Sequence, residues 1–353
     1  MTLELLRVLG DDGRALLDEA LLPDPTRRRE MFRQLWRARR IDERLSALQR
    51  QGRIGFFGSC FGQEAVPVAA AFALAPDDWV FPALREGAVM LVRGFPLTLY
   101  FAQMFGSARD VLKGRQMPSH QASRRVHQVS WSSSIGSQLP HAVGMAFAAA
   151  RAGDSAIALA FLGEGATSTP DFHAALNLAG VLRARVVFVC LNNQYALSTS
   201  ARRQTNSESF AVKARAYGLH GRRVDGNDVL AVELAVRQAS ESARSGLGPT
   251  LLECVTYRRG PHSSSDDPTR YRSAAEEADW AARDPVALFG RHLHAAGLLA
   301  PDDESRLLAA IDAEIDAALA VAEADPPPAR ETLFEDVYAR MPWHLAEQAR
   351  AAR

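Results

Sequence analysis

Apolar strand-like runs and helical spacings alternate through the middle of the chain. Ala156–Leu162 and Arg185–Leu191 are nearly continuous apolar runs, and a helical pattern over Asp171–Leu182 separates them. Apolar strands joined by a crossover helix pair in parallel, with both faces of the sheet covered. Further strands are predicted at Gly221–Val224 and Thr250–Thr256, with helices between them. The pattern therefore predicts an α/β fold with a parallel sheet flanked by helices.

Helical patterns also flank this region. One amphipathic helix begins after Asp24-Pro25, an N-cap followed by a first-turn proline, and continues to Gly52. Further helices are predicted at 63–74, 96–105, 140–151, 209–217, 229–245, 284–296 and 301–324. We expect an N-terminal helical segment (1–60), an α/β core (61–270), and a helical C-terminal region (271–353) that packs on the core or on a partner subunit.

A long polar stretch, from about Gly106 to Gln138, interrupts this pattern. Loops of this length inside a compact protein are usually functional or disordered. Apolar residues recur along the stretch, and we expect them to anchor an ordered loop: Met117, Val126, Val129, Trp131 and Ile135.

The composition is that of an ordinary globular protein. Of the 353 residues, 47% are hydrophobic and 23% are charged, and Lys plus Arg equals Asp plus Glu at 41 each. This balance provides no global field that would attract nucleic acid or a membrane surface. Arginine is concentrated between Arg27 and Arg53, which we interpret as a solvated helix face or a subunit contact rather than a nucleic-acid patch.

The three cysteines indicate a reducing compartment. Cys60, Cys190 and Cys254 are far apart and form no Cys-x-x-Cys pair, which argues against a disulfide framework or a zinc site. The acidic N-terminus does not resemble a signal peptide, and the longest apolar stretch, Ala65–Ala75, is about half of a membrane span. We expect a cytoplasmic protein with no membrane partner.

A carboxylate between two glycines follows the first apolar strand. Glu164 stands at the end of that strand, and Asn193 stands 29 residues later, at the end of the next one. Ligands of parallel sheets lie at the carboxyl ends of the strands, so we expect these two oxygen donors to be close together. Hard oxygen donors suit Mg²⁺, which often shares phosphate oxygens with the protein. Gly163 and Gly165 would let a diphosphate approach the backbone.

A dinucleotide-binding site is the competing interpretation of this turn. That fingerprint needs a third glycine where Ser168 stands, and an acid at the end of the second strand, where Asn192 stands. Both departures disfavour a nicotinamide-dependent dehydrogenase.

The whole stretch from Gly163 to Asn193 resembles the thiamine-diphosphate motif, in which Gly-Asp/Glu-Gly is followed at a fixed distance by Asn-Asn. More closely, the chain resembles the alpha subunit of the decarboxylating component of 2-oxoacid dehydrogenase complexes. The similarity runs in order through FGQEA, KGRQMP, RVDGNDV, GPTLLE, PHSSSDDPTRYR and FEDVYARMPWHL. The implied fold is the diphosphate-binding half of a thiamine-diphosphate enzyme.

The resemblance implies a role for each motif residue at the strand ends. Glu164, Asn193 and the backbone carbonyl of Tyr195 would hold Mg²⁺. Gly165 and Ala166 would offer backbone N–H groups to the diphosphate of the cofactor.

Other segments would complete the cofactor site. Arg85 in LREG matches a phosphate-binding arginine, and Ser133 and Ile135 match the segment whose backbone meets the aminopyrimidine. Two positions depart from the family: Leu84 replaces a usual tyrosine, and Leu191 replaces an arginine found in some relatives. These departures bear on cofactor affinity. A potassium-binding loop of branched-chain relatives is matched by Ser132, Ser134, Ser137 and Gln138.

Two neighbouring residues match the loop that meets the acyl acceptor. His262 corresponds to a histidine that faces the cofactor and the incoming lipoyl group, which implies a catalytic role in acyl transfer. Ser263 corresponds to a serine that is phosphorylated in mitochondrial relatives, and without a cognate kinase we expect it to be unmodified.

The resemblance also implies partners. Thiamine-diphosphate sites need two α/β units, and only the diphosphate half is predicted here, so we expect a beta-type subunit, an α₂β₂ assembly and a lipoyl-bearing acyltransferase component. The motifs KGRQMP and PHSSSDD favour branched-chain 2-oxoacids as substrates, as in branched-chain amino acid catabolism, with pyruvate and acetoin as alternatives. A non-catalytic structural subunit that has lost cofactor binding is a further alternative, motivated by Leu84 and Leu191.

Overall fold

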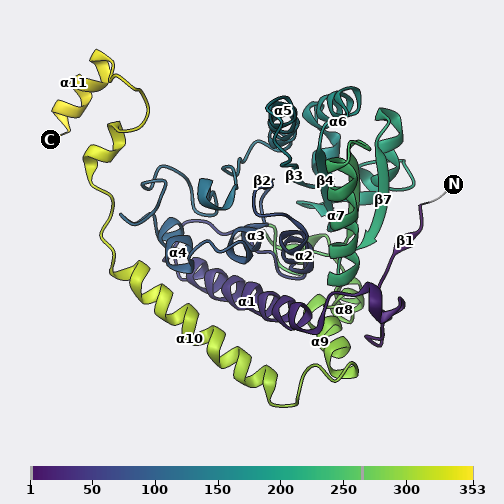
Figure 1. The fold of residues 1–353 in the computed structure, drawn as a ribbon. Coiled ribbons are helices and arrows are strands. Elements are labelled where there is room, and N and C mark those ends of the chain that lie inside the picture. Colours follow the sequence, from purple (N-terminus) through teal and green to yellow (C-terminus); the bar gives the residue numbers. More distant parts are fainter. Residues whose placement is uncertain (1–2, 264–265, 353) are drawn as a thin grey trace.

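The computed structural model describes residues 3–263 and 266–352, and its centre is a parallel β-sheet (Figure 1). The six strands lie in the order β1-β7-β8-β4-β3-β2, and every neighbouring pair is parallel. Their bounds are Leu5–Leu6 (β1), Trp79–Phe81 (β2), Ala158–Gly163 (β3), Val186–Asn192 (β4), His220–Asp225 (β7) and Thr250–Val255 (β8). The predicted α/β fold class is confirmed. The sequence pattern does not predict β1, because two residues are too few to show a period.

Helices cover both faces of this sheet. One face carries α1 (Pro25–Arg50), α2 (Ala65–Ala73) and α7 (Val229–Arg244), and the other carries α5 (Gln138–Arg151) and α6 (Pro170–Leu182). Alternate residues of the central strands enter the two cores, because successive side chains of a strand point to opposite faces. Leu159 of β3, for example, lies in the core under α2 and α7, whereas Ala160 lies in the core under α5.

The remaining helices lie outside these two layers. They are α3 (Gly87–Val92), α4 (Leu97–Phe105), α8 (Ala274–Ala281), α9 (Pro285–Ala295), α10 (Asp303–Ala324) and α11 (Trp343–Ala351). A short antiparallel pair, β5 (Tyr195–Ala196) and β6 (Thr199–Ser200), follows β4. The helix predicted at 209–217 is a 3₁₀ helix over Ala211–Tyr217. The other predicted helices and strands are found within a few residues of their expected bounds.

The arginine-rich stretch of α1 faces another helix of the same chain. Arg37, Arg40 and Arg44 pair with Glu314, Asp312 and Asp316 of α10, at 2.6, 2.8 and 2.6 Å. A third apolar cluster fills the space between α1, α4 and α10. The arginines therefore bind the C-terminal region to the core, an intrachain contact that the sequence analysis did not consider.

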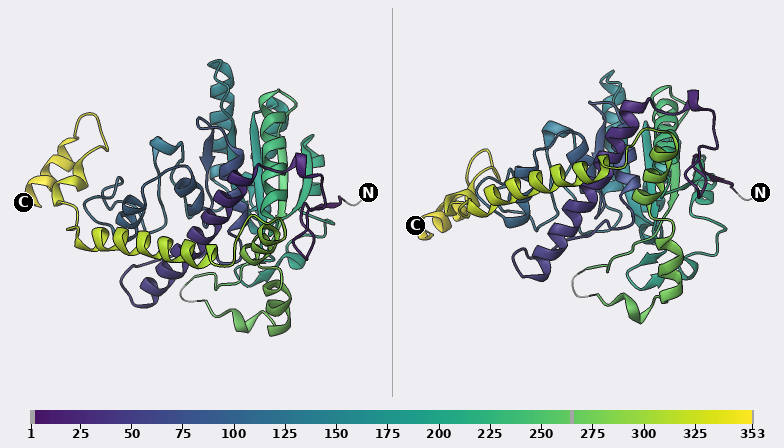
Figure 2. Two further views of the ribbon diagram at one scale, coloured as in Figure 1. Left: turned by 60° about the horizontal axis from the view of Figure 1, so that its bottom comes forward. Right: turned by 90° about the horizontal axis from the view of Figure 1, so that it is seen from below.

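Directly after α10 the chain contacts the stretch that follows α4, through ion pairs of Arg109 with Asp325 at 2.8 Å and of Lys113 with Glu335 at 2.7 Å. Figures 1 and 2 show the segment with α11 projecting away from the sheet, on the side opposite the N-terminus. Within the described part of the chain, no helix combines the length and apolar character that a membrane crossing requires.

The polar stretch after α4 is mostly irregular, with one 3₁₀ turn at Arg124–Val126. Two of its expected anchors, Val126 and Trp131, are buried. The expectation is wrong for Met117 and Ile135, which are 55% and 68% exposed. The sequence could not distinguish them, because an apolar residue in a loop without periodic structure shows no preferred face.

The cluster between α1, α4 and α10 provides a test of how the C-terminal region is held. Ile315 of α10 is 1% exposed, so Ile315→Ala should lower the free energy of unfolding by about 2–5 kcal/mol through lost burial and a new cavity. Val321→Ala is the matched control, because Val321 lies on the same helix and is 37% exposed. Urea unfolding followed by circular dichroism measures both. Equal losses for the two variants would contradict the packing described here.

Candidate active site

The ends of β3 and β4 bring the two predicted oxygen donors together. The strands pair in parallel with Gly163 opposite Leu191, so Glu164 and Asn193 follow at one edge of the sheet. The backbone N–H of Asn193 points to Oε2 of Glu164 across 3.4 Å. The expected juxtaposition is confirmed.

This edge opens into a cavity of about 350 Å³. All nine residues that the sequence analysis assigned to the cofactor site line it: Arg85, Ser133, Ile135, Glu164, Gly165, Ala166, Asn193, Tyr195 and His262. Leu84 and Leu191 line it as well, so the two positions that depart from the family lie in the same wall. Residues from five separate segments thus meet at the carboxyl ends of the central strands, as expected for a parallel sheet.

Asn192, the last residue of β4, and Asn193, the residue after it, have different roles. Asn192 donates through Nδ2 to Oε1 of the buried Glu253 on β8, at 2.8 Å, and this bond fixes the turn. Asn193 donates through Nδ2 to Oε1 of Gln63, at 2.9 Å, and both side chains line the cavity. Only the second asparagine therefore faces the cavity.

The glycines beside Glu164 have separate steric reasons. A Cβ at Gly165 would stand 2.6 Å from Cβ of Ala196, so the turn packs against β5 only with glycine there. A Cβ at Gly163 would meet no atom within 4 Å, and this residue lines the cavity. Glycine at 163 therefore leaves the cavity wall open to a ligand.

Glu164 is a buried carboxylate without a basic partner. It is 1% exposed, and burial raises the pKa of its carboxyl group. Its Oε1 accepts only a long bond from Nε2 of Gln204, at 3.3 Å, and no Lys, Arg or His among the described residues lies within 4.0 Å of its oxygens. A buried carboxylate is costly unless a cation or strong donors compensate it. The site is suited to a cation.

The carbonyl of Tyr195 lies near this carboxylate in the cavity wall. Its oxygen accepts a hydrogen bond from Nη1 of Arg258 at 2.8 Å, and a carbonyl oxygen has a second lone pair for another partner. Carboxylate, amide and carbonyl oxygens from Glu164, Asn193 and Tyr195 are the donor types that Mg²⁺ accepts. The residues present therefore fit a magnesium ion.

Two buried arginines line the same cavity without a carboxylate partner. Arg85 donates to the backbone carbonyls of Ser59 and His262, and burial together with the charge of Arg258 lowers its pKa to about 10. Arg258 donates to backbone carbonyls and to Tyr271. No Asp or Glu among the described residues forms an ion pair with either guanidinium within 4.0 Å. Guanidinium groups buried in this way are suited to an anion.

The sequence analysis missed Arg258. It stands just past the carboxyl end of β8, and β8 pairs with β4 on the side opposite β3. Glu164 and Asn193 are predicted because they follow adjacent strands. Arg258 would be predicted in the same way if β8 were known to lie next to β4. The order of strands within a sheet cannot be deduced from the sequence pattern.

The ring of His262 is neutral near pH 7. Burial, and then the charges of Arg85 and Arg258, lower its pKa to about 4. Nη2 of Arg85 approaches Nδ1 of the ring at 3.3 Å, and a guanidinium can only donate, so Nδ1 accepts and Nε2 carries the proton. The backbone N–H of His262 donates to Asp266 at 2.7 Å, which fixes the loop locally.

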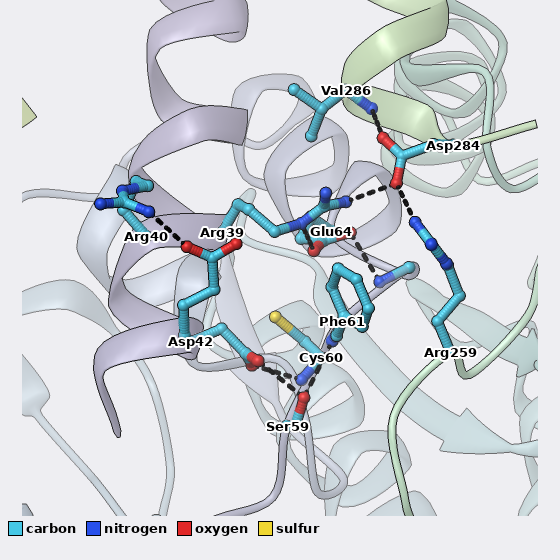
Figure 3. A network of polar contacts seen from close by, with 12 residues as sticks. Arg39, Arg40, Asp42, Ser59, Cys60, Phe61, Glu64, Arg259, Asp284 and Val286 are labelled. Carbon is cyan, nitrogen blue, oxygen red and sulfur yellow. Dashed lines mark hydrogen bonds and ion pairs between the residues drawn. The ribbon is translucent and has the colours of Figure 1, made fainter. Parts of the chain in front are cut away.

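A charged network ties this loop to neighbouring helices (Figure 3). Asp284, at the N-terminus of α9, accepts from Arg39 at 3.0 Å and from Arg259 at 2.7 Å. The guanidinium groups of Arg39 and Arg259 each lie 4.6 Å from the ring centre of Phe61. Glu64 also accepts from Arg39. The chain between β8 and His262 is thereby fixed to α1, α2 and α9.

The comparisons with known proteins match this geometry. A family profile described as "Dehydrogenase E1 component" matches residues 33–331. The chain is 42% identical to 2-oxoisovalerate dehydrogenase subunit alpha 1, mitochondrial, of Arabidopsis thaliana, over 97% of this chain and 73% of the relative. It is 39% identical to 2-oxoisovalerate dehydrogenase subunit alpha of Pseudomonas aeruginosa, over 98% of this chain and 86% of the relative. Pyruvate dehydrogenase E1 component subunit alpha of Staphylococcus aureus is 38% identical, over 98% of this chain and 91% of the relative.

A match over most of the chain at this identity shows the family, and it excludes the nicotinamide-dependent interpretation of the Gly-Glu-Gly turn. The chain belongs to the dehydrogenase E1 component family and is the alpha subunit of a 2-oxoacid dehydrogenase, an oxidoreductase.

Proposed function

We propose that the cavity binds thiamine diphosphate with Mg²⁺, and that the chain acts with an E1 beta subunit in the oxidative decarboxylation of branched-chain 2-oxoacids. The observation that carries this proposal is a separation of charge within one cavity. Glu164 lacks a cation partner, and Arg85 and Arg258 lack a carboxylate partner, although all three line the same walls. Glu86, the other carboxylate in the lining, is occupied by the backbone N–H groups of Ala83 and Arg85. A ligand that contains both a cation and an anion would compensate the Glu164 carboxylate and the two guanidinium groups.

The proposed binding roles follow from this arrangement. Glu164, Asn193 and the carbonyl of Tyr195 hold the metal, and the backbone N–H groups of Gly165 and Ala166 meet the diphosphate. Arg85 supplies charge to the same diphosphate. Ser133 and Ile135 line the cavity where the aminopyrimidine would lie. Thiamine diphosphate, when bound, supplies the carbanion that attacks the 2-oxo carbon and takes up the electrons left when carbon dioxide departs.

His262 acts in the second half of the reaction, when the acyl unit passes to the lipoyl group of the acyltransferase component. Its Nε2 proton faces away from Arg85, and the ring stays uncharged beside two guanidinium groups. A neutral imidazole would become an imidazolate if it gave up its proton, so the ring instead donates an Nε2 hydrogen bond to the sulfur that departs and gains negative charge. Arg85 thus sets the tautomer that presents this hydrogen bond.

The serine-rich loop beside the cavity is the proposed potassium site. Ser132 Oγ accepts from the backbone N–H of Ser134 at 3.1 Å, and Ser137 donates to the carbonyl of Ser134 at 2.8 Å. Gln138 donates through Nε2 to the carbonyl of Phe161 at 2.7 Å. Several oxygens of one short loop therefore lie together, as a monovalent cation requires.

The beta subunit would supply the aminopyrimidine half of the site, in an α₂β₂ assembly. Support comes from the sheet: the described residues form a single parallel sheet with one set of strand ends at the cavity. A reducing compartment, the cytoplasm in this proposal, is supported by three cysteines that are all free and buried.

Branched-chain 2-oxoacids are the proposed substrates because two of the relatives above carry 2-oxoisovalerate in their names and the cavity has apolar walls. Phe56 and Trp131 stack in the lining with ring centres 6.2 Å apart, next to Leu84, Leu191 and Ile135. Pyruvate is the alternative, since a pyruvate dehydrogenase subunit is nearly as similar. Acetoin is a third candidate substrate, and a structural subunit without cofactor is the competing function.

Removal of the Glu164 carboxylate tests the proposal. In the complex with the beta subunit, Glu164→Gln should weaken binding of thiamine diphosphate in the presence of Mg²⁺ by about 100-fold, the scale of a lost charged contact. Isothermal titration calorimetry measures the affinity. Glu241→Gln is the control, because Glu241 lies on the exposed side of α7. If the unaltered complex binds no thiamine diphosphate at all, the structural-subunit interpretation holds.

The tautomer and charge of His262 provide a second test. The ring pKa of about 4 implies that His262 in the cofactor-free complex takes up no proton between pH 8 and pH 5.5, whereas a histidine with the ordinary value of 6.5 would become half charged at pH 6.5. Nuclear magnetic resonance of ¹³C-labelled histidine, assigned with His262→Gln, follows this titration. In the unfolded chain the proton binds at the ordinary pKa, so neutral His262 contributes stability above pH 6.5 that is lost on acidification towards pH 4. A midpoint near 6.5 in the folded complex would refute this environment.

Substrate preference needs a direct comparison. We expect kcat/KM of the assembled complex for 2-oxoisovalerate to exceed that for pyruvate by at least about tenfold, because each extra buried methyl or methylene group contributes about 1–3 kcal/mol. The rate of reductive acylation of the lipoylated domain of the acyltransferase component gives kcat/KM for each substrate. A higher kcat/KM for pyruvate would contradict the branched-chain assignment and favour pyruvate as the substrate. It would not contradict the proposed cofactor site.

A further inference from the structure

We propose that Arg258 is a cofactor-binding residue of this chain, and that its guanidinium group contacts the diphosphate of thiamine diphosphate. The inference rests on the proposed function, since it assigns a further residue to the same cavity. It comes from the position and the hydrogen bonds of Arg258, which no motif of the sequence singles out.

The first support is an incomplete set of partners. Arg258 is 1% exposed, so its charge is removed from water. Nη1 and Nη2 donate to the carbonyls of Tyr195 and Leu197 at 2.8 and 2.9 Å, but Nε is buried without a hydrogen-bond partner among the described residues. Carbonyl groups compensate a buried guanidinium only in part, because they carry no net charge. An anion in the cavity would complete the environment.

The second support is the place of this group in the cavity. Arg258 lines the wall together with Arg85 and His262, and its Nη1 touches the carbonyl oxygen that the proposed metal site uses. An anion bound to the metal at Tyr195 would therefore border the guanidinium of Arg258. The hydroxyl oxygen of Tyr271 also accepts from Nη2, at 3.1 Å, which helps to fix the position of the side chain.

The third support is the scarcity of other side-chain donors. Leu84 and Leu191 line the cavity and offer no hydrogen bond. Arg85 already donates to the carbonyls of Ser59 and His262. Among the described side chains of the cavity wall, Arg258 is the second permanent positive charge. The negative charges of the diphosphate and of Glu164 together exceed the positive charges of Arg85 and a divalent metal. A second guanidinium group would compensate the remainder.

The experiment compares ligands that differ by one phosphoryl group. Affinities of the assembled complex for thiamine diphosphate and thiamine monophosphate are measured by calorimetry at saturating Mg²⁺. Arg258→Gln should lower the preference for the diphosphate by about 10- to 100-fold, the range of a charge-assisted hydrogen bond. The matched control is Arg237→Gln, because Arg237 lies on α7, pairs with Glu233 and does not line the cavity, and the preference should stay unchanged. Adding Leu191→Arg to Arg258→Gln should restore part of the preference, since position 191 faces the same space.

A role limited to bracing the turn at Tyr195 and Leu197 predicts different results. Arg258→Gln would then weaken both ligands equally, and that outcome overturns the inference. If Arg258→Gln fails to assemble, Arg258→Lys takes its place. If the charge of Arg258 binds the diphosphate, the lysine variant keeps its affinity for thiamine diphosphate. If Arg258 only braces the turn, the lysine variant binds both ligands more weakly, because one ammonium group cannot span both carbonyls. An unaltered complex that does not distinguish the two ligands would instead refute the proposed cofactor site.

Discussion

The parallel pairing of β4 with β3 on one side and β8 on the other is the constraint from which the site follows. Each strand ends at the same edge, so the residues that follow the strands project into the same space. Glu164 and Asn193 directly follow β3 and β4, and Arg258 is the third residue after β8. No local feature of the chain could bring these groups together, and the hydrogen bonds of the sheet fix their separation to within the reach of one small ligand.

This edge of the sheet holds charged side chains that have no oppositely charged partner within the described part of the protein. Elsewhere buried carboxylates are either paired or held by short hydrogen bonds: Asp78, whose side chain is fully buried, meets Arg244 at 2.9 Å, and Asp228 accepts from the backbone N–H groups of Val8 and Leu9 at 2.7 and 2.6 Å. At the cavity, the nearest partners of Glu164 and Arg258 are amides and carbonyls. The contrast within one molecule indicates that the cavity charges are reserved for a ligand. Burial, and then the charges of the two neighbouring guanidinium groups, lower the pKa of His262 and keep its ring neutral.

The loop that carries His262 depends on a second set of contacts, made outside the cavity. Arg39 and Arg259 enclose the ring of Phe61 and converge on Asp284, so the loop is fixed to α9 of the C-terminal region as well as to α1 (Figure 3). The helical ends of the chain are thus part of the support of the site. An alpha subunit that ended before Asp284 would keep the strand ends and His262, but it would lose the contact that fixes this loop to α9.

The sequence by itself determined the fold class, most helices and strands, and nine residues that meet in one cavity. It did so because apolar runs, helical spacing and the Gly-Glu-Gly and Asn-Asn motifs are local patterns, and because the resemblance supplied the remaining members, including the distant Arg85, Ser133, Ile135 and His262. Tertiary structure decided the rest. Strand order placed Arg258 beside Tyr195, helix packing gave the α1 arginines their partners on α10, and loop packing buried Trp131 while it left Ile135 exposed. Each of these depends on contacts between segments far apart in the chain, and such contacts leave no periodic trace in the order of residues.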